Sequence, residues 1–487
     1  MVQIDDTIQP ADAVGGAETT PLLTHPLRPP GGHLPGEVKP IPLKSCSIVA
    51  RCIFLLTIFE LGCCLIAIPL NQVLEAIICR NFYPQAPPSV NDLRCKAKAV
   101  QDELSIIRGW QSTLELIPSL LTAIPYGFLA DRQGREMVLG LSLLGMTLSS
   151  TFYILICALP TVFPIRTIWA SALLTFVGGG PAVFTAMIYA IAGDAVSEEH
   201  RSIMFSYISA AIVGGGLIAS PIVYLSMRIN VWIPIYTGLV CVIFATIITF
   251  TLPKTLQRDP QLKTTEPHLW HQTIRLELAK LGQAVLWALW KNQSVLMLLF
   301  TFLIITLTNL KQDTLLQYVT KRHSWSWAEA SILLSAQALS NLMLLAILIP
   351  SVTYVLVYKW SMSDQYTKLL LARASATSLT LGAFIVGFAS SSVVMVIGVC
   401  VFALGSGYRP LIRSLLASAV DDNVGMLFTM IGIFETTGNL IAGPLLSVLF
   451  RTGMEWGGAW IGLLYITTGC LLAIVTAIVV STRLSDL

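Results

Sequence analysis

The chain has 487 residues, of which 55% are hydrophobic and 12% are charged, and its formal net charge is +3. Soluble domains carry about 25% charged residues, so this composition excludes an ordinary soluble protein and indicates a membrane protein. The small net charge gives no reason to expect a nucleic-acid partner.

The first stretch, residues 1–47, is rich in Pro, Gly and Thr, and it predicts a disordered cytoplasmic tail. No signal peptide is visible, because the first apolar run starts only near residue 48. The tail contains ETTPLL (18–23), an acidic-dileucine sequence that serves as a sorting address in eukaryotes. A vacuolar or endosomal membrane therefore stays open beside the plasma membrane.

Twelve apolar runs are long enough to cross a bilayer, which takes about 20 residues in a helix. They predict an all-α membrane protein of two six-helix halves, 48–252 and 294–481, with a short tail at 482–487. The connection at 253–293 is polar and basic, and it contains a segment that suits an amphipathic helix on the membrane surface. The predicted spans are 48–70, 109–130, 136–158, 165–192, 202–226, 231–252, 294–316, 327–352, 367–390, 393–418, 424–449 and 459–481.

The distribution of Lys and Arg predicts the orientation. An even number of spans puts both termini on one side, and more Lys and Arg fall on the inner side when the termini are cytoplasmic. The margin is modest, because the first outer loop is itself basic and is taken to include Arg108. Cys79 and Cys95 then face the exterior, where a disulfide between them would persist.

The two halves carry matching sequences. GGLIASP (215–221) in the fifth span corresponds to GNLIAGP (438–444) in the eleventh. Around the fourth and tenth spans the corresponding pairs are Gly178 and Gly405, Gly180 and Gly407, and Asp194 and Asp421. Two related halves facing each other across a cavity can expose it to each side of the membrane in turn, which predicts a transporter.

The turn after the second span, GFLADRQGRE (127–136), places several charges at the membrane boundary. This stretch resembles the signature of the major facilitator superfamily, G-x-x-x-D-R-x-G-R-basic, with Glu136 in place of the last base. The resemblance implies that Asp131 meets the start of the eleventh span and that Arg135 pairs with Asp194. We predict a conformational latch formed by Gly127, Asp131, Arg132, Gly134, Arg135 and Asp194.

A second motif bears on the direction of transport. The fifth span, from Gly216 to Pro221, resembles a degraded form of the glycine-proline motif of proton-driven drug exporters, and Gly443 and Pro444 repeat it in the eleventh span. The alternative is that these small residues only let helices pack closely. Residues 108–136 also resemble fungal efflux pumps found beside secondary-metabolite genes and, more loosely, the proton-coupled folate transporter family.

Ionisable residues inside spans are costly and usually line a cavity. We predict a proton or substrate site at Glu60, Glu115, Arg409 and Glu435. The alternatives are a hydrogen-bonded helix contact for Glu60, access to outer water for Glu115, and a permanent salt bridge between Glu435 and Arg409.

Three further charged residues near the ends of spans receive no such role. Lys311 and Asp313 are interpreted as a solvated rim at the outer end of the seventh span. Arg413 is close enough to the inner surface to extend its charge into water.

These features together predict a proton-coupled exporter of a small organic molecule, monomeric and without cofactor or metal. Uptake of a metabolite or vitamin is the alternative that shares the fold, and a non-transporting receptor is the alternative of another class. A phosphate-binding loop, metal-ligand spacing and Ser/His/Asp arrangement are all missing from the sequence, which argues against an enzyme.

Overall fold

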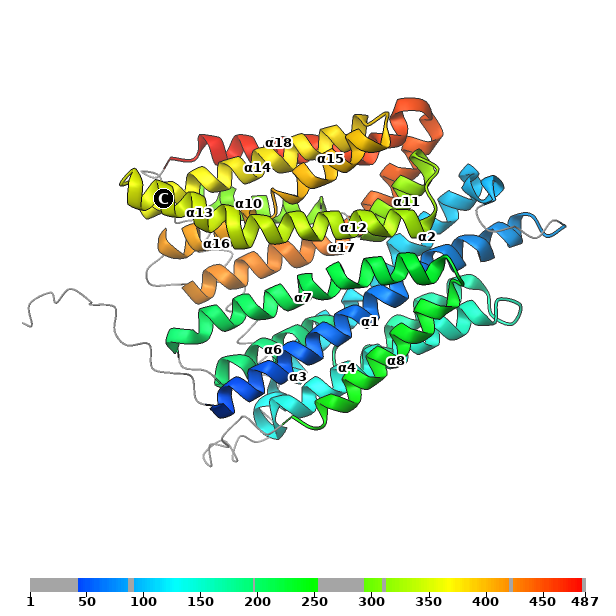
Figure 1. The fold of residues 1–487 in the computed structure, drawn as a ribbon, viewed down its shortest axis with the longest axis horizontal. Coiled ribbons are helices and arrows are strands. Elements are labelled where there is room, and N and C mark those ends of the chain that lie inside the picture. The colour runs from blue at the N-terminus through cyan, green and yellow to red at the C-terminus, as the bar shows by residue number, and fades with distance from the viewer. Residues whose placement is uncertain are drawn as a thin grey trace, which may run out of the picture. The chain divides into compact units, whose positions relative to one another are not determined.

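The computed structural model describes residues 43–85, 92–195, 198–252, 293–308, 312–419 and 424–483. These ranges belong to one compact unit (Leu43–Leu487), and their secondary structure is helical throughout (Figure 1). The predictions for residues 1–42 and for most of the 253–293 connection lie outside the described residues, as do Lys311 and Asp421.

The first half contains helices α1 to α8. Their bounds are α1 (Leu43–Phe82), η1 (Leu93–Lys96), α2 (Lys98–Leu114), α3 (Leu116–Gln133), α4 (Arg135–Ala158), η2 (Ile165–Ala170), α5 (Ser171–Leu174), α6 (Gly180–Ala195), α7 (Glu198–Met227) and α8 (Trp232–Thr249). Three boundaries in this half differ clearly from the prediction, since α1 takes in residues 43–47 of the supposed tail and continues to Phe82, and α2 begins at Lys98 rather than near 109. The amphipathic sequence KAVQDELSIIRGW therefore continues the second span and is not part of a loop.

The second half contains helices α10 to α18. Their bounds are α10 (Gln293–Leu307), α11 (Gln312–Arg322), α12 (Trp327–Met343), η4 (Leu344–Leu348), α13 (Ile349–Tyr354), η5 (Val355–Lys359), α14 (Asp364–Phe388), α15 (Ser392–Ala403), α16 (Tyr408–Ala419), α17 (Val424–Trp456), η6 (Gly458–Gly462) and α18 (Leu463–Ser481). Figure 1 shows these helices running roughly alongside those of the first half. Within the described residues, ten helices are long and apolar enough to cross a membrane, and Ile165–Leu174 and Gln293–Leu307 are shorter apolar helices.

The short helices belong to spans that are broken. The fourth span divides into η2–α5 and α6 at Gly178, Gly179 and Gly180, whose φ angles are +81°, +79° and +66°. Side chains disfavour such angles, so glycine is required for this break. The tenth span also divides, between α15 and α16. The glycines that match in the two halves therefore mark breaks in both.

The second span is interrupted at Glu115, between α2 and α3. Pro118 lacks the N–H that would bond to the carbonyl of Leu114, so the helical ladder is interrupted just before it.

The two halves share a core at one end of the bundle. One buried cluster joins first-half residues such as Leu74 and Val100 to second-half residues such as Leu316 and Trp327, whereas another consists of second-half residues alone. We call the end that carries Cys79 and Cys95 the disulfide end, and the end that carries the 127–136 turn the Gly134 end. The shared core shows that the halves meet closely at the disulfide end.

Candidate functional site

A cavity of about 280 Å³ lies among α1, α2, α4 and α6. Phe59 and Ile66 of α1 contribute apolar walls, while Arg108 and Glu115 of the second span contribute charge. Asp313 of α11 completes the lining from the other half. Apolar walls with a few convergent polar groups are typical of small-molecule sites.

Arg108 is the cation of this cavity. Its Nη1 donates to Gln111 Oε1 at 3.3 Å, and Gln111 Nε2 donates to Glu115 Oε1 at 3.0 Å. The guanidinium lies 5.5 Å from the centre of the Tyr153 ring, while its Nε and Nη2 are buried without a hydrogen-bond partner. The charge is thus held by an amide and an aromatic face and is not neutralised by a direct ion pair. Sequence reasoning missed Arg108 because the predicted span began one residue after it.

Asp313 lies at the boundary between the halves. Asn71 Nδ2 donates to Asp313 Oδ1 at 2.6 Å, so α1 and α11 are joined directly. Asp313 also lines a smaller cavity of about 50 Å³ between α2 and α17, together with Arg108 and Ser112. The prediction of a solvated rim is therefore wrong for Asp313, because its carboxylate lines two cavities and accepts a hydrogen bond from the buried Asn71.

The glutamates predicted for the first half occupy different places. Glu115 lines the 280 Å³ cavity and accepts a hydrogen bond from Gln111 there, so its interpretation as a residue that merely reaches outer water is wrong. Glu60 lies against α7, where a β-carbon on Gly215 would come within 3.0 Å of the Glu60 Cβ. The structure therefore separates Glu60 from Glu115.

In the second half, Glu435 pairs with Arg413 and not with Arg409. Arg413 Nη2 lies 2.6 Å from Oε1 and 2.7 Å from Oε2 of Glu435, and its guanidinium lies 5.8 Å from the centre of the Phe302 ring. The two arginines are four residues apart and share one face of α16, so their spacing could not identify the partner. Arg413, whose side chain is 41% exposed, therefore has an ion-pair partner that the sequence analysis did not assign to it, and the alternative of a permanent salt bridge between Glu435 and Arg409 is wrong.

Arg409 instead lines a separate cavity of about 180 Å³ in the second half, with Gln337 and Asn341. Asn341 Oδ1 is buried there without a hydrogen-bond partner. Each half therefore has its own polar cavity that contains one arginine.

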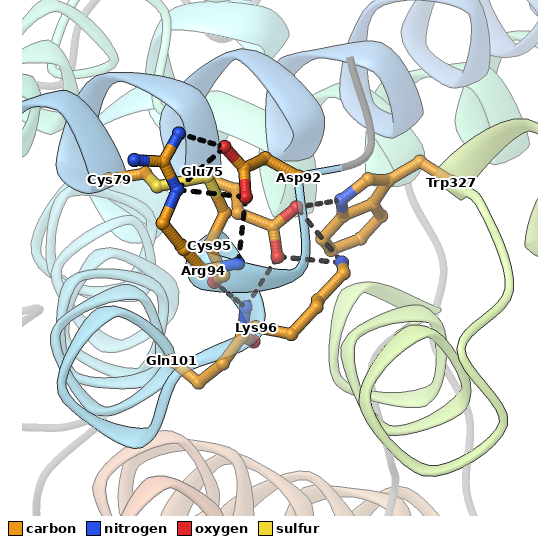
Figure 2. Close-up of a disulfide and its surroundings, with 8 residues drawn as sticks. All are labelled: Glu75, Cys79, Asp92, Arg94, Cys95, Lys96, Gln101 and Trp327. Atoms are coloured by element: carbon orange, nitrogen blue, oxygen red, sulfur yellow. Dashed lines mark hydrogen bonds and ion pairs between the residues drawn. A yellow bond between two sulfur atoms is a disulfide. The ribbon is translucent and has the colours of Figure 1, made fainter. Parts of the chain in front are cut away.

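Figure 2 shows the cluster at the disulfide end, where Cys79 at the end of α1 is bonded to Cys95 in η1. The next residue, Lys96, donates to Glu75 Oε1 at 2.7 Å and to Oε2 at 2.9 Å. Trp327 Nε1 of the second half donates to Glu75 Oε2 at 2.7 Å. Glu75 was missed because the first span was predicted to end at residue 70, whereas α1 continues to Phe82.

Further bonds extend this cluster across the halves. Gln101 donates to Glu75, and Gln317 of α11 donates to the backbone oxygen of Gln101 at 3.0 Å. Lys321 donates to the backbone oxygen of Lys96. Burial lowers the pKa of Lys96, and its ion pair with Glu75 acts in the opposite direction. The carboxylate of Glu75 thus receives donors from both halves.

At the Gly134 end, Arg135 Nη1 lies 2.5 Å from Asp194 Oδ2 and donates to the backbone oxygen of Ala190 at 2.9 Å. Gly134 has a φ angle of +111°, which permits α4 to start directly after α3. Arg132 lies exposed in the last turn of α3, and Gly127 lies in the same helix. The side chain of Asp131 lies outside the described residues. The ion pair joins the start of α4 to the end of α6.

The glycine-proline motif serves different purposes in the two halves. A β-carbon on Gly443 would lie 2.5 Å from the backbone oxygen of Gly109, so α17 and α2 come close together there. A β-carbon on Gly216 would meet no atom within 4 Å, so close packing does not explain that glycine in this arrangement. Pro221 and Pro444 lie inside α7 and α17.

The fold and the cavity define a multi-pass membrane transporter of two halves. Residues 105–361 match the family model described as Major Facilitator Superfamily. The MFS efflux pump atnC of Emericella nidulans is 30% identical over 98% of this chain and 95% of its own length. The efflux pump ustT of Aspergillus flavus is 27% identical over 85% of this chain and 83% of its own length. The chain belongs to the Major Facilitator Superfamily.

Solved structures agree on the fold. The D-xylose-proton symporter has a TM-score of 0.59 at 14% identity, over 90% of this chain and 97% of its own. The human organic anion transporter MFSD10 (TETRAN) has a TM-score of 0.58 at 14% identity, over 89% of this chain and 99% of its own. The predictions of a major facilitator fold, of likeness to fungal efflux pumps and of a transporter rather than an enzyme are confirmed.

Proposed function

We propose that this protein exports a small organic molecule from the cytoplasm by alternating access, as a monomer driven by protons. The observation that carries the proposal is the 280 Å³ cavity, in which Arg108 and Glu115 of one half face Asp313 of the other. A site lined by both halves changes when the halves rock about it. The names of the relatives atnC and ustT, both efflux pumps, support export.

The Gly134 end faces the cytoplasm in this proposal, and the disulfide end faces the exterior or an organelle lumen. Positive charge on the cytoplasmic side and a disulfide on the opposite side both favour this orientation. The structure then represents a transporter closed at its outer end. The Arg135–Asp194 pair, with Asp131, acts as the cytoplasmic latch that is made and broken in each cycle.

The experiment compares cells with and without the protein by untargeted mass spectrometry of medium and cell interior. A compound that falls in the medium and accumulates inside when the protein is missing identifies an exporter and its cargo. A protonophore should abolish the difference if protons drive it. The reverse distribution would make the protein an importer, and no redistribution of any compound would overturn the proposal.

A further inference from the structure

Asp313 is the second-half residue that reaches into the 280 Å³ cavity, whose other lining residues lie between Phe59 and Pro181. It stands in the first turn of α11. Asp313 therefore moves with the second half, while its surroundings in this cavity move with the first.

The bond that holds Asp313 in place is a neutral one. Asn71, whose side chain is almost completely buried, donates to Asp313 Oδ1 at 2.6 Å and to the backbone oxygen of Ala67 at 3.1 Å. Arg108 lines the same cavity, but its Nε and Nη2 have no hydrogen-bond partner, so it makes no direct pair with Asp313. Enclosing a carboxylate that is not directly paired with a cation is costly.

Among the described residues that line the cavity, the charges around Asp313 do not balance. Asp313 interacts electrostatically with Arg108 of α2, Tyr153 of α4 and Cys64 of α1. Glu115, between α2 and α3, lines the same cavity and interacts with Arg108. With both carboxylates ionised, one guanidinium faces two negative charges in a region of low dielectric, where like charges repel strongly. One proton on the pair of carboxylates makes the cavity neutral. When the halves move apart, Asp313 leaves this cavity with the second half. Glu115 stays in it, because it belongs to the first half like the rest of the described lining.

We propose that Asp313 is the residue through which protons close the disulfide end. Its carboxylate takes a proton from water when that end is open, enters the first-half cavity as a neutral group bonded to Asn71, and releases the proton to water when the Gly134 end is open. The assignment rests on the proposed function, and it names the coupling residue of the same cavity.

The test is hydrogen–deuterium exchange of the purified full-length protein in lipid nanodiscs, followed by mass spectrometry at about pH 5 and about pH 8. Labelling times are scaled for the pH dependence of chemical exchange. The reporter peptides cover the α2–α17 contact, where Ser105 Oγ donates to Ser447 Oγ at 2.9 Å. The wild-type protein should exchange about threefold more slowly there at the lower pH, because the disulfide end is closed for more of the time.

Substitutions locate the proton. Asp313→Asn, which mimics the protonated group, should exchange slowly at both pH values, and Asp313→Glu should restore the pH dependence. The matched control is Asp364→Asn, since Asp364 is an exposed aspartate paired with Lys368 at 2.6 Å, and it should behave as the wild type. Glu115→Gln tests the other carboxylate of the cavity.

Three outcomes overturn the proposal. The exchange rate of the α2–α17 peptides could be independent of pH in the wild-type protein, it could keep its full pH dependence in Asp313→Asn, or it could lose that dependence in Glu115→Gln but not in Asp313→Asn. If Asp313→Asn does not fold, Asp313→Glu and Glu115→Gln still decide between the two carboxylates. Export of a compound by a wild-type protein that fails this test would leave the proposed function intact. A protein that passes the test but redistributes no compound would instead overturn the proposed function.

Discussion

The two ends of the helix bundle hold their charges in different ways. At the disulfide end, the side chains of Glu75 and Lys96 are 7% and 16% exposed, and Glu75 is also bonded to Trp327 of the other half. At the Gly134 end, Arg135 and Asp194 are 22% and 28% exposed, and both belong to the first half. The first arrangement joins the two halves through buried hydrogen bonds, whereas the second joins two helices of the same half. Breaking one partner out of a buried network is strongly destabilising, whereas a partly exposed pair can open and close at little cost.

The largest expected effect comes from breaking the buried cluster. Glu75→Gln leaves Lys96 without its counter-ion, and removal of one partner of a buried pair costs about 3–5 kcal/mol. The thermal unfolding midpoint of the detergent-purified protein should fall clearly. The matched control is Glu103→Gln, whose exposed pair with Arg166 should contribute less than about 1 kcal/mol. Equal shifts in the two variants would remove the distinction between the ends.

The disulfide should have the next largest effect. Cys79 and Cys95 are separated by 16 residues, and closing a loop of this size is worth about 3 kcal/mol by the chain-entropy account. Cys79→Ser should lower the unfolding midpoint and loosen the position of Lys96 against Glu75. Cys470→Ser removes an exposed free cysteine and should leave the midpoint unchanged. If Cys79→Ser lowers the unfolding midpoint but leaves hydrogen–deuterium exchange in the α2–α17 peptides unchanged, the disulfide serves only to close the loop.

The pair at the Gly134 end should behave in the opposite way. Arg135→Gln should cost about 1 kcal/mol or less in stability, because the pair is partly solvated. It should nevertheless slow efflux severalfold, measured as the rate at which a preloaded cargo leaves cells. The exchanged pair Arg135→Asp with Asp194→Arg should recover part of the rate. Full efflux by Arg135→Gln would show that this end is not the latch.

The smallest effect concerns pH at the disulfide end. Burial, and next the nearby Arg322, lower the pKa of His323 from its ordinary value of 6.5. The unfolded chain therefore takes up a proton at a pH at which the folded protein resists it, so stability falls as the pH drops below about 6.5. His323→Gln should flatten this dependence by less than about 0.5 kcal/mol, because the ring is partly exposed. An unchanged pH profile of the unfolding midpoint would exclude this contribution.

The sequence identified those features that a short motif or a few neighbouring residues reveal. The resemblance of residues 127–136 to the superfamily signature implied a pairing of Arg135 with Asp194, which lie 2.5 Å apart in the structure. The cysteines of the first loop, the only pair in a long polar stretch of the first half, lie together in a disulfide. Glu435 was recognised as a charged residue within a span, but Arg409 was considered as its possible partner, whereas Arg413 on the same helix is the arginine that pairs with it.

The sequence by itself determined the membrane setting, the two related halves and the superfamily, because hydropathy, matching glycines and a short motif all act over a few tens of residues. Only the tertiary structure decided where the charges meet. Arg108 and Asp313 are more than two hundred residues apart along the chain, and both stand at apparent ends of apolar runs. They share a cavity because α2 begins earlier in the chain than hydropathy indicates and because Asp313, in the first turn of α11, is bonded to Asn71 of α1. Both effects depend on packing between the halves, which leaves no periodic trace in the sequence.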